Sequence, residues 1–416
     1  MSKIREYLES HKEEMINFLA ELVAVRSVQN EPNGEYPFGK KPAKALEKML
    51  NKCSEYGFTT ENIDWYAGSA DFNNLEPELA ILTHLDVVPE GTGWSSDPYV
   101  LKRSDGRLIG RGTCDDKGPA VASLFALKAL RELAIPLKKG VRLIFGTNEE
   151  NGSADLAYYR TKRNLPPMVF TPDGEYPVIN GEKGMLRVYF SAPFTGISIE
   201  AGKVINAVPE LCINGIDFEA FIYGGKSAHA STPEKGENAI TKFLAYSGYN
   251  NKLLCGLAKL FPHNEFNGES IFGDISGITC VLSLLNTSEI RVKGGIDIRF
   301  PLDRTKAEIS KIICNKLESI GFEIDSCEGT EPHYTDENSE FVQSLLRVYE
   351  HTTGNKGHCI TIGGGTYVHE IEGGVAFGAE FPNEDSNMHG ANEFITEENL
   401  LKNAEIMAEA IIELCG

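Results

Sequence analysis

The sequence predicts an α/β protein with an inserted α+β region, and three observations support this. In the first half of the chain, short apolar segments typical of strands alternate with segments of helical periodicity. The middle is rich in strand patterns separated by turn residues, as in residues 184–193 and 289–301. The last part returns to helix and strand. Because 416 residues are too many for one compact core, we expect two domains.

Hydrophobic periodicity places the individual elements. Residues 1–25 are expected to form one amphipathic helix, with Ile4, Leu8, Ile16 and Leu22 mostly on one side, and its glutamates argue against a secretory signal. The remaining expected strands are 78–88, 141–146, 167–171, 359–362 and 374–378. The remaining expected helices are 119–134, 237–261, 305–320, 339–351 and 397–414.

Charge and composition exclude several classes of function. A formal net charge of -20 argues against binding to nucleic acid or to an anionic membrane through bulk electrostatics. A run of 18 apolar residues does not occur, so no membrane span is expected. The 9 cysteines are scattered without C-x-x-C spacing, which argues against a disulfide framework or a structural zinc site. These features together predict a protein of the reducing cytoplasm.

Motifs for several common enzyme classes do not occur in the sequence. It has no G-x-S-x-G nucleophile elbow, no complete phosphate loop, no complete dinucleotide fingerprint and no H-E-x-x-H pair. The chemistry must therefore come from residues that the fold brings together.

Five segments place carboxylates or a histidine beside glycine or proline, four of them where a strand or turn ends, and the first contains His84 and Asp86. Residues two apart in a strand point to the same side, so these two side chains can share one face. A histidine that binds metal through one nitrogen commonly donates its other N–H to an orienting carboxylate. His84 as a ligand and Asp86 as its orienting acid fit this arrangement; an incidental ion pair at a strand end is the alternative.

The next two segments carry pairs of acids. Asp115 and Asp116 follow a glycine turn and precede a helix, where capping of the helix explains one of them. Glu149 and Glu150 follow an apolar strand. Two carboxylates in a confined site are costly unless one binds a cation and the other works as an acid or base. Two solvated loop glutamates are the alternative.

The last two segments contribute Asp173, at another strand end, and His389, in an irregular segment before the last helix. An ordinary Asp-Gly turn also explains Asp173. Taken together, the five segments supply two histidines, two aspartates and one glutamate as ligands, plus a spare glutamate. That set suits a pair of divalent ions joined by a carboxylate and a shared water.

The sequence resembles the M20 family of metallopeptidases, in particular its bacterial dipeptidases of the PepV type. The matching blocks run in the same order through nearly the whole chain. They are "THLDVVP", "GRGTCDDKGP", "EENGS", "PDGEYPVINGEKG", "GKSAHASTPEKGENA", "DIRFP" and "GGGTY".

The resemblance implies roles for the acids and histidines. His84 and Asp173 would bind one metal, Glu150 and His389 the other, and Asp115 would bridge them. Glu149 would be the general base that deprotonates the bridging water and passes the proton to the leaving amine. The metals implied are two divalent ions, zinc first, with manganese or cobalt as alternatives.

The resemblance also implies residues on the substrate side. His229 would stabilise the oxyanion, and Asp86 would orient His84. The implied substrate contacts are Arg299, Asn206, Gly364, Thr366 and His369, although a salt bridge with Asp297 is another reading of Arg299. His369 departs from the family pattern, which has arginine at that position. Histidine lacks the bidentate fork of arginine, so substrate specificity is expected to differ there.

For the fold, the resemblance implies a three-layer α/β/α metallopeptidase domain with a mixed sheet, plus an inserted α+β lid domain. Residues 1–185 and 332–416 would form the catalytic domain, and residues 186–331 the lid. The lid looks shorter than in the monomeric dipeptidases, which leaves a monomer and a homodimer through the lid both open.

The function implied is hydrolysis of dipeptides by a two-metal enzyme, with a small peptide as its substrate. An M20-type N-acyl amino acid deacylase, desuccinylase or carboxypeptidase on the same apparatus is the first alternative. A non-catalytic metal or peptide binder is the second, and the presence of Glu149 argues against it because a binder has no need of a base.

Overall fold

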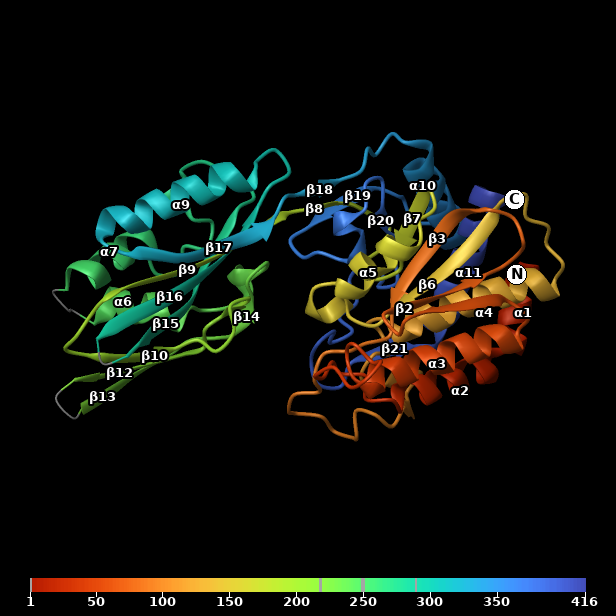
Figure 1. The fold of residues 1–416 in the computed structure, drawn as a ribbon, viewed down its shortest axis with the longest axis horizontal. Coiled ribbons are helices and arrows are strands. Elements are labelled where there is room, and N and C mark those ends of the chain that lie inside the picture. Colours follow the sequence, from red (N-terminus) through yellow and green to blue (C-terminus); the bar gives the residue numbers. More distant parts are fainter. Residues whose placement is uncertain (1, 217–218, 248–250, 289) are drawn as a thin grey trace. The chain divides into compact units, whose positions relative to one another are not determined.

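The computed structural model describes residues 2–216, 219–247, 251–288 and 290–416. The chain divides into two compact units (Figure 1). Unit 1 consists of Met1–Asn180, Thr335–Ile360 and Thr366–Gly416, and unit 2 of Gly181–Tyr334 and Thr361–Gly365. The chain passes between the units within β8 (Val178–Glu182), after β18 (His333–Tyr334), within β19 (Cys359–Ile362) and after Gly365.

The largest sheet is mixed and has the strand order β1-β2-β6-β3-β7-β20-β8-β18, with β19 paired to β8. The central strand β3 runs parallel to β6 and β7, and the outer pairs β1–β2, β2–β6 and β8–β18 are antiparallel. The strands not yet given are β1 (Thr59–Ile63), β2 (Ala67–Asp71), β3 (Pro77–His84), β6 (Gly140–Gly146), β7 (Met168–Thr171) and β20 (Val375–Ala376).

Alternating residues of β3 enter two separate cores. Leu79 and Ile81 pack in a cluster with α4 (Lys117–Glu132) and α11 (Glu397–Cys415), whereas Ala80 and Leu82 pack with α5 (Ala154–Lys162) and the 3-10 helix η3 (Tyr367–Glu370). Both faces of the sheet are therefore covered, which explains why β3 reads as a continuous apolar run. The predicted three-layer α/β/α arrangement with a mixed sheet is confirmed.

The N-terminal segment differs from its prediction as one helix. It forms α1 (Lys3–Ser10) and α2 (Lys12–Val23), which are separated at His11 by a non-helical backbone conformation (φ -108°, ψ 10°). The apolar spacing continues across the break, and so the pattern did not reveal it. The other elements of unit 1 are α3 (Lys40–Glu55), α10 (Glu340–Thr353), the 3-10 helix η1 (Glu149–Asn151) and a small sheet of β4 (Lys102–Ser104), β5 (Arg107–Ile109) and β21 (Phe394–Thr396).

Unit 2 is α+β, as predicted. Its main sheet has the order β13-β12-β10-β15-β16-β9-β17, and its helices share one apolar core with that sheet. The strands are β9 (Gly184–Pro193), β10 (Ser198–Ala201), β12 (Leu211–Ile216), β13 (Glu219–Gly224), β15 (Thr279–Thr287), β16 (Arg291–Phe300) and β17 (Glu323–Thr330). A separate ribbon pairs β11 (Ala207–Val208) with β14 (Ala228–His229).

The helices of unit 2 correct one further prediction. Instead of one helix over 237–261, the structure has α6 (Ala239–Tyr246) and α7 (Lys252–Leu260), and residues 248–250 of the predicted span lie outside the described residues. Each helix starts at its own asparagine cap, Asn238 and Asn251, which accept backbone N–H bonds. The others are η2 (Pro233–Lys235), α8 (Glu269–Phe272) and α9 (Lys306–Ile320).

The unit boundaries differ in detail from the predicted domains. The unit borders fall after residues 180 and 334, compared with predicted borders after 185 and 331. Thr361–Gly365, expected in the catalytic domain, belongs to unit 2. Its backbone is bonded there, since Ile362 O accepts from Lys183 N and Gly363 O accepts from Arg299 Nη1. Among the helices of the described residues, none is both long and apolar enough to cross a membrane.

Candidate metal centre

Unit 1 brings together two groups of possible metal ligands that share Asp115. One group is His84, Asp115 and Asp173, and the other is Asp115, Glu150 and His389; within each group the ligand atoms lie within 4.8 Å of one another. These residues come from the end of β3, the turn before α4, the loop after β7, η1 and the segment before β21. The five segments expected to carry chemistry thus meet at one edge of the sheet.

His84 is buried and has one nitrogen directed at each side of the site. Its Nδ1 lies 3.1 Å from the main-chain carbonyl oxygen of Asp86 and 3.5 Å from the Oδ1 atom of Asp86. A carbonyl oxygen only accepts, so Nδ1 carries a proton, and in the neutral ring Nε2 keeps its lone pair. Nε2 lies 2.9 Å from Asp115 Oδ1 and 3.8 Å from Asp173 Oδ2. This tautomer leaves Nε2 ready to bind a cation.

Asp115 directs its two oxygens to the two histidines. Oδ1 faces His84, while Oδ2 lies 2.7 Å from His389 Nε2. His389 Nε2 is also 3.3 Å from Glu150 Oε2. A carboxylate with one oxygen in each ligand group has the geometry that bridges two ions.

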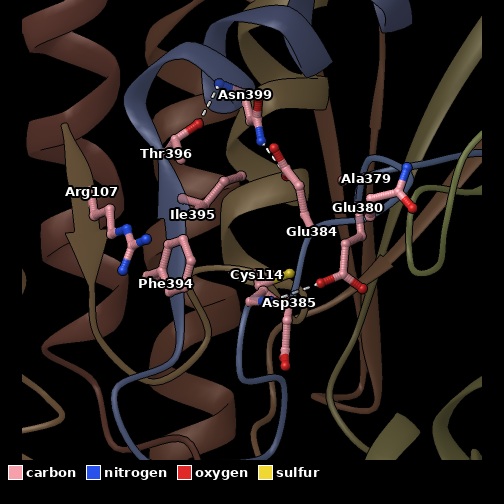
Figure 2. A pocket seen from close by; sticks show the side chains of 12 residues that line it. Arg107, Cys114, Ala379, Glu380, Glu384, Asp385, Phe394, Ile395, Thr396 and Asn399 are labelled. Carbon is pink, nitrogen blue, oxygen red and sulfur yellow. Dashed lines mark hydrogen bonds between the residues drawn. The ribbon is translucent and has the colours of Figure 1, made fainter.

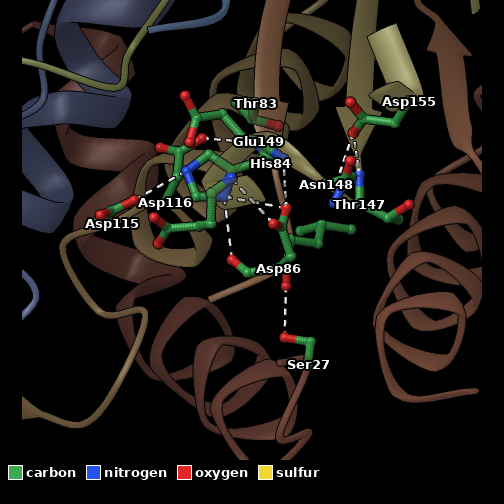
Figure 3. Close-up of polar contacts among 12 residues, drawn as sticks. Ser27, Thr83, His84, Asp86, Asp115, Asp116, Thr147, Asn148, Glu149 and Asp155 are labelled. Atoms are coloured by element: carbon green, nitrogen blue, oxygen red, sulfur yellow. Dashed lines mark hydrogen bonds and ion pairs between the residues drawn. The ribbon is translucent and has the colours of Figure 1, made fainter. Parts of the chain in front are cut away.

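Asp86 contacts the loop that carries Glu149 and Glu150 as well as His84 (Figure 3). Strand β3 ends at His84, not at residue 88 as predicted, and Asp86 therefore lies beyond it. Its Oδ1 accepts from the backbone N–H of Glu149 at 3.1 Å, and its Oδ2 from that of Glu150 at 3.2 Å. One side chain thus fixes the main chain of both glutamates.

Asp116 does not cap α4, which was the ordinary explanation for an acid at that position. The side chain makes no capping bond, although Asp116 stands at the N-cap. Its Oδ2 instead accepts from the backbone N–H of His84 at 2.9 Å. Asp116 therefore holds the main chain of a candidate ligand.

A second buried acid, Asp155, supports the residues just before this loop. Asp155 Oδ2 accepts from the backbone N–H of Thr147 at 2.5 Å and of Asn148 at 2.7 Å, directly before Glu149. It also accepts from the hydroxyl of Tyr367 at 2.5 Å. Sequence reasoning did not identify Asp155 or Tyr367, because the contact between them joins residues 212 positions apart.

Electrostatics reflect the crowding of charges. Burial opposes the change, but the neighbouring imidazoles of His389 and His84 hold the pKa of Asp115 below its usual range. Burial, with the charge of Asp115, raises the pKa of Asp173 to about 7. Burial also raises the pKa values of Glu149 and Glu150, helped by neighbouring carboxylates. Protons thus stabilise this cluster when no other cations are present.

The residues fit divalent metal ions. Oxygen and imidazole ligands without thiolate suit zinc, manganese or cobalt. In the described part of the chain, the buried atoms His84 Nε2 and Asp115 Oδ1 have no partner of hydrogen-bond geometry. These two atoms lie 2.9 Å apart, and each can give a lone pair to a cation. The site can therefore hold two ions, one in each ligand group.

Unit 2 carries His229 on its β11–β14 ribbon, and Asn206 directly precedes β11. His229 pairs with Ala207, and the carbonyl of Asn206 accepts from Ala230 N at 2.9 Å, so the two predicted residues lie close together at one end of the ribbon. His229 Nδ1 accepts the backbone N–H of Ser231 at 3.2 Å. A neutral ring then carries its proton on Nε2, which makes that atom a hydrogen-bond donor.

Arg299 makes the salt bridge that was the alternative to substrate binding. Its Nε lies 2.6 Å from Asp297 Oδ1, and its Nη1 donates to the carbonyl of Gly363 at 2.9 Å. The side chain is buried. In this structure, Arg299 holds the glycine segment that begins at Gly363.

The remaining predicted substrate residues lie in or just after that glycine segment. A Cβ atom added at Gly364 would meet no heavy atom within 4 Å, so the space beside it is open. Thr366 Oγ1 accepts from Val368 N and caps η3. His369 is part of η3 and is half-buried.

A cavity of about 260 Å³ is lined in part by Cys114 (Figure 2). Its wall includes Cys114, Glu380 and Phe394, and it includes none of the five candidate ligands. Burial, with Glu380 and Glu393 nearby, raises the pKa of the Cys114 thiol well above its ordinary value. The thiol is therefore expected to pack as a small apolar group.

With the site in view, comparisons with known proteins identify the family. The model of peptidase family M20/M25/M40 matches residues 80–413. The chain belongs to this family. The resemblance drawn from the motifs is thereby confirmed.

One relative that this chain resembles is a Beta-Ala-Xaa dipeptidase of Lactobacillus delbrueckii subsp. lactis. It is 33% identical, and the alignment covers 99% of this chain and 98% of the relative. The alignment spans 470 positions against 416 residues here, so the relative has residues with no counterpart in this chain.

Solved structures show the same fold. Human carnosine dipeptidase 1 has a TM-score of 0.69 at 18% identity, covering 99% of this chain and 98% of the other. The YXEP protein of Bacillus subtilis, described as a dinuclear metal binding peptidase from the M20 family, has a TM-score of 0.60 at 14% identity, covering 97% of this chain and 98% of the other.

Proposed function

We propose that this M20 chain is a two-metal peptidase that cleaves the peptide bond of dipeptides. The observation that carries the proposal is the pair of ligand groups that share Asp115, with Glu149 on the adjoining loop. The full-length similarity to a Beta-Ala-Xaa dipeptidase supports the choice of substrate.

In this proposal, His84 and Asp173 hold one ion, Glu150 and His389 hold the other, and Asp115 holds both. The ions would supply Lewis acidity and lower the pKa of water at the site. Glu149 accepts the proton of the attacking water and returns it to the leaving amine. Burial raises the pKa of Glu149 above its ordinary value, which strengthens this carboxylate as the acceptor of the proton.

The proposed role of Asp86 follows from its contacts. Asp86 fixes the imidazole of His84 through its carbonyl oxygen and fixes the amide of Glu149 through its carboxylate. The base and the first ligand are thereby set by one residue. We assign Asp86 a positioning role, since its side chain contacts the loop and not a reacting atom.

Unit 2 is proposed to act as the lid that meets the substrate. His229 is assigned as the donor to the oxyanion, supported by the proton that its Nε2 carries in the neutral ring. Asn206 is assigned to the substrate because it neighbours His229 on the ribbon. Arg299, Gly364, Thr366 and His369 are assigned to the substrate end, with Arg299 acting through the Gly363 segment that it holds.

The finer assignments complete the proposal. We propose zinc as the metal, with manganese or cobalt as replacements, and the cytoplasm as the location, consistent with 9 scattered cysteines. Nucleic acid and membranes are not expected partners, given the net charge of -20. A monomer and a homodimer through unit 2 are both compatible with the proposal.

A substrate panel tests the function. The protein is stripped with a chelator, restored with each metal in turn, and assayed on dipeptides, tripeptides and N-acetyl amino acids. The proposal expects dipeptide hydrolysis that disappears on chelation and returns with metal. Rapid deacylation or tripeptide cleavage without dipeptide cleavage would replace it with another M20-type activity.

A further inference from the structure

A buried ion pair outside the ligand set links two parts of the metal centre. Arg111 Nη1 lies 2.6 Å from Glu393 Oε2, and the two side chains are 1% and 0% exposed. Arg111 precedes α4 and Glu393 precedes β21, so the pair joins segments 282 residues apart in sequence. A buried pair is costly unless further hydrogen bonds satisfy both charges, and the partners of this pair are informative for that reason.

The second carboxylate oxygen of Glu393 contacts Asp115, the ligand that both groups share. Its Oε1 accepts the backbone N–H of Cys114 at 2.9 Å and that of Asp115 at 3.2 Å. The main chain of Asp115 is therefore fixed by a buried carboxylate that does not enter the ligand groups.

The second terminal nitrogen of Arg111 contacts another candidate ligand, His389. Its Nη2 donates to the carbonyl of His389 at 3.2 Å, with longer contacts of 3.4 Å to the carbonyls of Pro89 and Glu90. The rigid fork of a guanidinium can reach Glu393 and His389 at once, which a lysine ammonium cannot do in the same geometry.

We propose that Arg111 and Glu393 are positioning residues that set the separation of Asp115 and His389 for tight binding of one ion. This inference rests on the proposed binding of metal. It concerns the group Asp115, Glu150 and His389, because the pair contacts the main chain at two of its three members.

The other ligand group has separate supports. The backbone N–H of His84 is held by Asp116, and that of Asp173 by the hydroxyl of Thr171. Loss of the contact from Arg111 to His389 is therefore expected to weaken the binding of the ion at the His389 group more than the binding of the other ion. A general loss of stability would not separate the two affinities.

The test is Arg111→Lys, which keeps the charge beside Glu393 and removes the fork. Arg142→Lys is the matched control, since Arg142 makes a two-nitrogen pair with Asp71 in the same unit and contacts no ligand residue through that pair. Metal-free parent and variants are titrated with Zn²⁺ by calorimetry, and their melting temperatures are measured by circular dichroism.

We expect the parent to bind two ions and Arg111→Lys to lose roughly 10- to 100-fold in affinity for one of them, the usual effect of removing a partner behind a metal ligand. The affinity for the other ion should stay close to that of the parent, and Arg142→Lys should leave both affinities unchanged. Equal affinities in Arg111→Lys and the parent would overturn the inference, as would a parent that binds fewer than two ions.

A second variant tests the other half of the pair. Glu393→Gln places an amide N–H₂ against Arg111 or against the backbone N–H groups, and because Asp115 belongs to both ligand groups, both ions should bind more weakly. Unchanged binding in this variant would contradict the role of Glu393. Because the titrations contain no substrate, a parent that binds two ions without cleaving dipeptides would remove the proposed function and leave this inference standing.

Discussion

The Oδ1 atom of Asp86 accepts a hydrogen bond from the backbone N–H of Glu149 at 3.1 Å. The carbonyl oxygen of the same aspartate lies 3.1 Å from the Nδ1 atom of His84. One residue therefore positions both the first candidate ligand and the candidate base. Asp86 therefore supports His84 through its main chain and Glu149 through its side chain.

Asp86→Asn should lower kcat and metal affinity together. The amide can place only one acceptor oxygen against the two N–H groups of Glu149 and Glu150, so one of them faces another donor. We expect metal affinity to fall by about 10- to 100-fold. Asp71→Asn on β2 is the control, and equal losses in the two variants would mean that Asp86 has only a general structural role.

Tyr367→Phe should disturb, through Asp155, the loop that carries Glu149 and Glu150. The change removes the hydroxyl that donates to Asp155 and leaves a buried acceptor with one partner fewer, at a cost of about 1–3 kcal/mol in the free energy of unfolding. We expect kcat to fall as well, because Asp155 fixes the residues directly before Glu149. Tyr159→Phe, in the same apolar cluster, is the control and should keep the parental kcat.

The metal-free protein should lose stability as pH rises. Burial raises the pKa of Asp173 from 3.8 to about 7, and stability from its proton is lost as pH rises through that range. Although burial opposes it, contact with Asp115 and Glu150 raises the pKa of His389 from 6.5 to about 11, which acts in the same direction above pH 6.5.

Metal ions replace those protons, so the rise in melting temperature on adding Zn²⁺ should be larger at about pH 8 than at about pH 5.5. Thermal melts of chelated and metal-restored protein at the two pH values measure this. A metal-induced rise that is larger at the lower pH would contradict the assignment of these carboxylates and imidazoles to the ions.

Cys114 should react slowly despite its place beside Asp115. Burial and neighbouring carboxylates raise the pKa of its thiol, so the reactive thiolate is scarce at neutral pH. Iodoacetamide should label the half-buried Cys255 before Cys114, as followed by mass spectrometry of the native protein. Rapid labelling of Cys114 with parallel loss of activity would instead reveal a redox-sensitive position in the centre.

The part of the centre that sequence could predict shares one local signal. His84, Asp115, Glu150, Asp173 and His389 each stand in a short segment where polar residues interrupt or follow an apolar pattern, and the structure places them in two groups. The layers of unit 1 were predictable for a related reason, since β3 and β6 are apolar on both faces.

The supporting residues had no such signal. Glu393 bonds to residues more than 270 positions away, and Tyr367 to Asp155 at a separation of 212, so only the folded chain shows what they do. The break at His11 was missed because neither glycine nor proline marks it and the apolar spacing continues. The role of Asp116 was missed because an acid before a helix has a sufficient local explanation in capping.

The most direct test of the central claim measures the kcat and metal content of Glu149→Gln together. We expect the variant to bind two ions with the affinity of the parent and its kcat on a dipeptide to fall by about 10²- to 10⁴-fold, since only the proton acceptor is lost. A variant that holds two ions and turns over at the rate of the parent would contradict the assignment of Glu149 as the base.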